Sequence, residues 1–90
     1  MPKATRNVTV GSRVGLHARP ASLFVQAVAT TGHDVTISKS SGDSADGASI
    51  LAVLALAAGH GESLELVVEG DDAERVADEL ATLLESDLDA

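Results

Sequence analysis

One histidine in the first third of the chain stands among residues that suit chemistry on a small anion. His17 lies in the run Gly15–Ala21 (GLHARPA), and Pro20 is tolerated only in the first turn of a helix, so we expect a helix to begin near His17. The positive end of that helix and the Arg19 guanidinium both disfavour the imidazolium form, which leaves a nitrogen lone pair free. Backbone N–H groups at a helix start bind anions, and Gly15 lets a phosphate approach closely. The pattern suits phosphoryl transfer to and from His17, and it is equally typical of a histidine that only caps the helix.

The other histidines indicate no metal site. His33 and His60 stand beside glycines in turn-like segments, where we expect solvated loop residues. The spacing of the three histidines matches no metal-binding motif. The chain has no cysteine, which excludes disulfides, thiolate zinc sites, iron–sulfur clusters and a cysteine nucleophile.

Charge is distributed unevenly along the 90 residues. Residues 1–33 contain four basic side chains and no carboxylate, whereas residues 34–90 contain two basic side chains and all 14 carboxylates, for a net charge of −8. A surface dominated by acid repels a phosphate backbone, so we expect no binding to nucleic acid. The basic first third could still receive one small anion.

The sequence predicts neither secretion nor membrane insertion. The first ten residues lack the apolar core of a signal peptide. The longest uncharged run, Gly47–Gly61, has 15 residues including three glycines, which is too short to span a bilayer. We therefore expect a cytoplasmic protein.

Hydrophobic periodicity predicts the elements that must position His17. Alternation indicates strands at Asn7–Val10, Val35–Ser38 and Leu64–Glu69, with a short fourth strand at Ser44–Asp46. Helices are predicted at Ala18–Thr31 with Gly32 as the cap, at Ser49–Ala57, and from a cap at Asp71 or Asp72 to Leu84. The order β-α-β-β-α-β-α indicates a two-layer α/β sandwich in one domain over residues 1–90, with a frayed tail from about residue 86.

The predicted middle helix is apolar around nearly its whole surface. Val53, Leu56 and Ala57 are enough to anchor it on a sheet, which leaves Ile50, Leu51 and Leu54 on the exposed side. An uncovered apolar patch is typical of a partner surface. The alternative is that the helix is fully buried.

The run at residues 15–21 resembles the active-site signature of the HPr family, the histidine-containing phosphocarriers of the bacterial phosphoenolpyruvate-dependent sugar phosphotransferase system. The resemblance covers nearly the whole chain, and Phe24 falls where the family carries a phenylalanine on its first helix. It implies an HPr-like α+β fold, an open-faced β-sandwich in which a four-stranded antiparallel sheet is covered on one face by three helices. It also implies that His17 is phosphorylated on Nδ1, that Arg19 steadies the phosphoryl group, and that no cofactor is needed.

The resemblance further implies the partners of the chain. Enzyme I would be the phosphoryl donor and IIA domains of sugar permeases the acceptors, and both would dock on Ile50, Leu51 and Leu54. Ser49 aligns with the serine that an HPr kinase phosphorylates in some members, although Ala48 stands here where a lysine is common. The alternative for Ser49 is a helix cap with no regulatory role. We expect a monomer.

Several functions stay open at this stage. The first is a carrier for sugar uptake, which forms a phosphohistidine without being an autonomous enzyme. The second is an HPr paralogue in a nitrogen-related or regulatory phosphorelay, which differs only in its partners. The third is a non-catalytic interaction module that uses the apolar patch. An autonomous enzyme is disfavoured because the sequence has no phosphate-binding loop, no metal set and no second catalytic base near His17.

Overall fold

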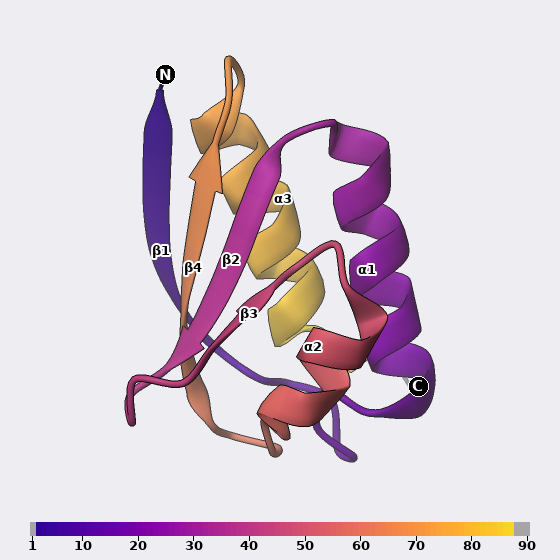
Figure 1. The fold of residues 1–90 in the computed structure, drawn as a ribbon. Coiled ribbons are helices and arrows are strands. Elements are labelled where there is room, and N and C mark those ends of the chain that lie inside the picture. The colour runs from indigo at the N-terminus through magenta and orange to yellow at the C-terminus, as the bar shows by residue number, and fades with distance from the viewer. Residues whose placement is uncertain (1, 88–90) are drawn as a thin grey trace.

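The computed structural model describes residues 2–87, and the elements in this range follow the predicted order (Figure 1). The strands are β1 (Lys3–Thr9), β2 (Asp34–Lys39), β3 (Ser44–Asp46) and β4 (Ser63–Glu69). The helices are α1 (Ala18–Thr31), α2 (Ile50–Leu56) and α3 (Ala73–Glu85). The strands pair antiparallel in the order β1-β4-β2-β3, and the helices lie on one face of the sheet (Figure 1). The predicted open-faced β-sandwich is confirmed.

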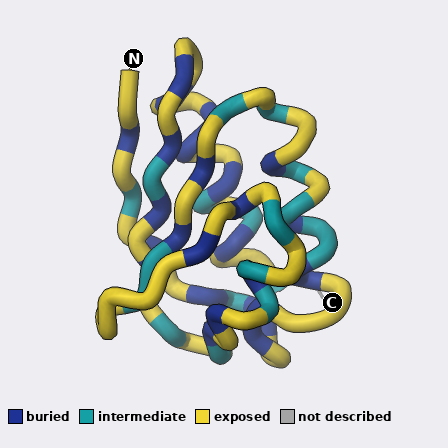
Figure 2. The backbone as a smooth tube through the Cα atoms, in the orientation of Figure 1, coloured by how far each residue is buried: buried dark blue, intermediate teal, exposed yellow. Residues whose placement is uncertain are grey.

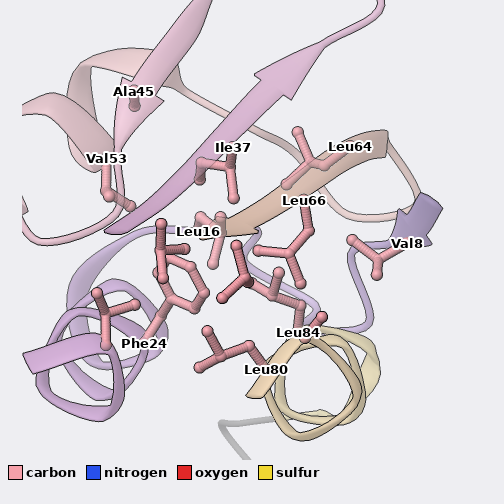
Figure 3. Packing of buried hydrophobic residues seen from close by; sticks show 14 of the residues in the cluster. Val8, Leu16, Phe24, Ile37, Ala45, Val53, Leu64, Leu66, Leu80 and Leu84 are labelled. Atoms are coloured by element: carbon pink, nitrogen blue, oxygen red, sulfur yellow. The ribbon is translucent and has the colours of Figure 1, made fainter. Parts of the chain in front are cut away.

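The core lies between the sheet and the helices because alternate strand residues are apolar. Val8 stands opposite Leu64 in the register of β1 and β4, and Ile37 of β2 stands opposite Leu66. Phe24 points from α1 into this layer, as Figure 3 shows. Because its ring is fully buried, truncating Phe24 to alanine would cost about 3–5 kcal/mol. This packing holds α1, and with it the start of the helix at His17, against the sheet.

Two predicted helices have the expected bounds and apolar stripes. α1 runs over Ala18–Thr31 and ends at Gly32, whose φ of 68° is the left-handed conformation that favours glycine. α3 buries one apolar stripe against the sheet, and along its sequence buried residues alternate with exposed ones (Figure 2). Its buried members are Ala73, Val76, Ala77, Leu80 and Leu84.

The ends of other elements differ from the prediction. β1 begins at Lys3 rather than Asn7 because it pairs along the whole of β4, from Glu69 to Ser63. α2 ends at Leu56, and Ala57 adopts the left-handed conformation with φ 55° and is exposed. The prediction that Ala57 packs on the sheet is therefore wrong.

The amino-terminus of α3 shows a second correction. Asp72 is the cap residue, but its side chain makes no capping hydrogen bond and instead lies 3.3 Å from Arg75. The backbone N–H of Asp72 donates to His33 Nε2 at 3.0 Å, and His33 Nδ1 lies 2.7 Å from the Thr31 carbonyl oxygen. His33 lies in the loop between α1 and β2 as predicted, but the prediction that it is solvated is wrong, because it is half-buried and both ring nitrogens bind backbone groups.

The chain after α3 was predicted to fray from about residue 86. The Ser86 hydroxyl donates to the Thr82 carbonyl oxygen at 2.7 Å, and the Asp87 carboxylate lies 3.3 Å from Arg13 Nε. Residues 88–90, the rest of that predicted tail, lie outside the described residues.

Candidate functional site

The loop between β1 and α1 is fixed to the segment that follows α2. Four hydrogen bonds join the two segments, and three of them are between backbone atoms. They run from Val10 N–H to Glu62 O (3.0 Å), from Gly61 N–H to Val10 O (2.9 Å), from Leu16 N–H to Ala58 O (2.8 Å), and between His60 Nδ1 and Ser12 O (3.0 Å). The segment that leads into His17 is therefore held by these contacts in addition to its own turn, in which Gly15 N–H donates to Ser12 O at 3.0 Å.

Gly15 is needed where this loop passes the Ala58 carbonyl. Its φ is +73°, and a Cβ atom added there would lie 2.4 Å from Ala58 O and 2.9 Å from Gly59 Cα. Both contacts are with backbone atoms, so no side-chain rotation could relieve them. Because Gly15 lies so close to Ala58, the side chain of the next residue, Leu16, can be fully buried in the core. Leu16 thereby fixes the chain one residue before His17.

His17 is the cap residue of α1. Its backbone is extended, with φ −125° and ψ 164°, and its side chain makes no capping hydrogen bond. The residue is exposed, and its imidazole has no hydrogen bond or ion pair with any residue in the described range 2–87. The ring is therefore accessible at the amino-terminus of a helix, where backbone N–H groups favour an anion.

Ala18, the residue after His17, has a strained backbone. Its φ of 47° lies in the left-handed region, which costs a non-glycine residue about 1–3 kcal/mol. Such strain persists only where the neighbouring structure imposes it. Here Leu16 is hydrogen-bonded on one side, and the buried Pro20 packs on the other. The strained residue is therefore the one at which the backbone changes direction, directly after the exposed His17.

Arg19 follows His17 by two residues in the chain and makes no ion pair with a described residue. Four of the six basic side chains form ion pairs with carboxylates: Arg6 with Glu74 and Asp78, Arg13 with Asp87, Lys39 with Glu62, and Arg75 with Asp72 and Glu79. Arg19 and Lys3 have no ion pair with another described residue. Lys3 lies at the start of β1, at the opposite end of the sheet from the start of α1 (Figure 1). The first turn of α1 contains no acidic residue, so no carboxylate of the described residues 2–87 competes with an anion at His17 for Arg19.

The exposed side of α2 carries the residues expected to form the apolar patch. Ile50 and Leu51 have 38% and 77% of their surface exposed, whereas Leu54 is half-buried and packs against the core. Ser49 caps this helix, because its hydroxyl oxygen accepts the Ala52 N–H at 3.2 Å. The alternative of a fully buried helix is wrong, because Ile50 and Leu51 are exposed while Val53 and Leu56 are buried. The prediction that Leu54 lies on the exposed side is correct only in part, because Leu54 also packs against the core.

Val14 is an exposed apolar residue that sequence reasoning missed. It lies three residues before His17, and 52% of its surface is exposed. A single valine in a loop has no periodicity, so only its place between Arg13 and Gly15 in a turn could have drawn attention to it. α2 packs against α1 and ends next to the Ala58–Leu16 hydrogen bond, so the apolar side chains lie on the elements that surround His17 (Figure 1).

The rim of this surface is basic. The Arg13 side chain is 85% exposed, and its Nε lies 3.3 Å from the carboxylate of Asp87, whose side chain is 28% exposed. Within the described residues no three His, Asp or Glu side chains are grouped so that they could hold a metal ion. None of the described helices is long and apolar enough to cross a membrane. The site therefore consists of an accessible imidazole, helix N–H groups, a guanidinium and exposed apolar side chains.

Comparisons with known proteins point to one family. The family model described as "PTS HPr component phosphorylation site" matches residues 4–86. A phosphocarrier protein HPr of Streptomyces coelicolor is 46% identical over 86 residues, which cover 96% of this chain and 92% of that protein. An HPr of Haloferax volcanii is 48% identical over 80 residues, covering 88% and 90% respectively. The crystal structure of an HPr from Bacillus anthracis superposes with a TM-score of 0.86 at 35% identity, covering 91% of this chain and 96% of that one.

Proposed function

The chain belongs to the HPr family of phosphocarriers of the phosphotransferase system, and from this we propose that His17 accepts a phosphoryl group from phosphorylated Enzyme I and passes it to the IIA domains of sugar permeases. The observation that carries the proposal is the accessible His17 imidazole at the start of α1, beside an Arg19 without an ion pair to any described residue. The chain carries the group between partners in the cytoplasm as a monomer and is not an autonomous enzyme.

The transfer exchanges one nitrogen–phosphorus bond for another. The Nδ1 lone pair of His17 attacks the phosphorus of the donor phosphohistidine, and the electron pair of the broken bond returns to the donor ring nitrogen. Because the bonds formed and broken are of one kind, the step is close to balanced in free energy and runs in either direction. The protein contributes positioning, together with stabilisation of the equatorial oxygens by the backbone N–H groups of α1 and by Arg19.

The surface around His17 suits successive partners. Ile50, Leu51 and Leu54 supply an apolar centre, and Arg13 and Arg19 supply a basic rim, an arrangement that favours weak and fast association. Ser49 stands at the edge of this surface. A phosphate on its hydroxyl would add negative charge beside the apolar patch and oppose docking, whereas the contact that the structure contains is a helix cap.

A two-stage relay assay tests the proposal. The chain is incubated with Enzyme I and labelled phosphoenolpyruvate, and a purified IIA domain is added afterwards. We expect the label to enter the chain and then move to the IIA domain. His17→Ala should accept no label, whereas His33→Ala, which removes an imidazole near the other end of α1, should still accept it.

The two stages separate the alternatives. Label that enters His17 but reaches no sugar-specific IIA domain would favour a nitrogen-related or regulatory relay. A chain that accepts no label from a demonstrably active Enzyme I would overturn the proposal. Arg19→Ala should slow the first stage by about 100-fold, because it removes a charged donor to the transferring oxygens.

A further inference from the structure

We propose that Glu62, together with Lys39, is a positioning residue for His17, although neither side chain belongs to the signature that surrounds the histidine. The effect of Glu62 on the reaction presupposes the proposed phosphoryl transfer, whereas its position is given by hydrogen bonds and an ion pair within this chain. Glu62 shapes the segment after α2, and that segment supplies the Ala58 carbonyl that holds the residue before His17.

The segment over residues 57–62 has little intrinsic order. It contains Gly59 and Gly61, and Ala57 already occupies a left-handed conformation. Glycine loses more conformational entropy on folding than other residues, so this segment needs contacts that select one conformation. Two reciprocal hydrogen bonds do so: the Glu62 carboxylate accepts the Gly59 N–H at 2.9 Å, and the Glu62 N–H donates to the Gly59 carbonyl oxygen at 3.1 Å.

Lys39 connects this turn to α2. Its ammonium nitrogen lies 3.2 Å from the second carboxylate oxygen of Glu62 and donates to the Leu56 carbonyl oxygen, 3.3 Å away, at the end of α2. The Lys39 and Glu62 side chains are only 21% and 30% exposed, so water screens this pair less than the exposed pairs on α3. A cation at the carboxyl end of a helix is also favoured by the helix dipole.

The charge state of Glu62 agrees with this role. The Gly59 N–H lowers the pKa of the Glu62 carboxyl most strongly; partial burial opposes that effect, and Lys39 adds to it. The carboxylate is therefore the form that the turn stabilises. Both of its oxygens are engaged, one by the backbone of the turn and one by Lys39.

The path from Glu62 to His17 is short and consists of backbone. Gly59 is fixed by the carboxylate, Ala58 precedes it and accepts the Leu16 N–H, and Leu16 precedes His17. Gly15 packs directly on Ala58 and Gly59, so a shift of the turn would also displace the loop at the residue before Leu16. Lys39 also binds the carboxyl end of α2. The Lys39–Glu62 ion pair therefore fixes the position of α2 relative to His17. A misplacement of about 1 Å can slow an aligned transfer by about 100-fold.

Two substitutions of Glu62 test the proposal against a matched control. Glu62→Ala removes both carboxylate contacts, whereas Glu62→Gln keeps an acceptor for the Gly59 N–H and loses the charge that pairs with Lys39. Asp78→Asn is the control, because it disrupts an ion pair of similar length (Arg6 Nε to Asp78, 2.9 Å) between β1 and α3. All three are compared with the wild type by amide hydrogen exchange and by the rate of phosphorylation from Enzyme I at several concentrations of the chain.

We expect Glu62→Ala to speed exchange of the Leu16 amide by at least about 10-fold, with amides of the β1–β4 ladder unchanged, because local opening is selective. The maximal rate of phosphorylation should fall by about 10-fold while the half-saturating concentration changes little, with Glu62→Gln in between and Asp78→Asn like the wild type. Unchanged Leu16 exchange in Glu62→Ala, or an equal change in Asp78→Asn, would overturn the positioning role. Failure of the wild type to accept phosphate would overturn the proposed function instead, and the exchange measurement would still decide the positioning.

Discussion

Gly15 and Gly32 form a natural pair for measuring how tightly the loop before His17 is packed. Their φ angles are nearly equal, +73° and +68°, so an alanine at either position meets the same left-handed backbone. Their surroundings differ completely. A Cβ atom at Gly15 would lie 2.4 Å from the Ala58 carbonyl oxygen, whereas one at Gly32 would meet nothing within 4 Å.

The expected losses of stability follow from this difference. Gly32→Ala should lower the free energy of unfolding by about 1–2 kcal/mol, the cost of a left-handed alanine. Gly15→Ala carries the same cost and must also move two backbone segments apart by about 1 Å, which breaks or weakens the Leu16 N–H bond to Ala58. A buried backbone pair left unsatisfied adds about 1–3 kcal/mol, for a total of about 2–5 kcal/mol.

Urea denaturation of both variants and the wild type measures these losses, and phosphorylation by Enzyme I measures their consequence. At a urea-free condition where all three are folded, Gly15→Ala should accept phosphate about 10-fold more slowly, while Gly32→Ala should match the wild type. Equal losses of stability in the two variants would refute the reasoning, because the loop would then have room for a methyl group beside Ala58.

Three further outcomes follow from the structure. Ala57→Gly should raise the free energy of unfolding by about 1 kcal/mol, because Ala57 is exposed and holds φ 55°; thermal denaturation checks this, and an unchanged midpoint would contradict it. The Glu62 carboxyl has a pKa below its ordinary value of 4.5, so its stabilisation is present at neutral pH and is lost as the pH falls through that lowered pKa. Between about pH 5 and pH 3 the wild type should therefore lose more stability than Glu62→Gln in urea titrations, and parallel losses would argue against the carboxylate contacts. Leu51→Ser should change stability by less than about 0.5 kcal/mol because Leu51 is 77% exposed, yet raise the half-saturating concentration with Enzyme I by about 5-fold; an unaltered value would remove Leu51 from the docking surface.

Local periodicity and chain-breaking residues made much of the fold predictable. The bounds of α1 follow from Pro20 and Gly32, and the buried stripe of α3 follows from apolar residues that recur every three or four positions. The order of the elements and the exposure of Ile50 and Leu51 were predictable for the same reason. These features depend on residues that are close in the sequence.

The rest depends on contacts between distant residues. The bond from Asp72 N–H to His33 joins residues 39 positions apart, and the Lys39–Glu62 pair joins two segments that no sequence pattern relates. The left-handed Ala18 was unpredictable because alanine has no preference for that conformation; the hydrogen bond of Leu16 on one side and the packing of Pro20 on the other impose it. The place of His17 at a helix start was thus predictable, while the structure that holds it there was not.

The measurement that tests the central claim most directly is the intact mass of the chain after incubation with phosphoenolpyruvate, Mg²⁺ and active Enzyme I. The account predicts one added phosphoryl group, lost in mild acid because protonation of the ring makes it a good leaving group, and absent from His17→Ala. An unchanged mass, or an acid-stable phosphoryl group that persists in His17→Ala, would contradict it.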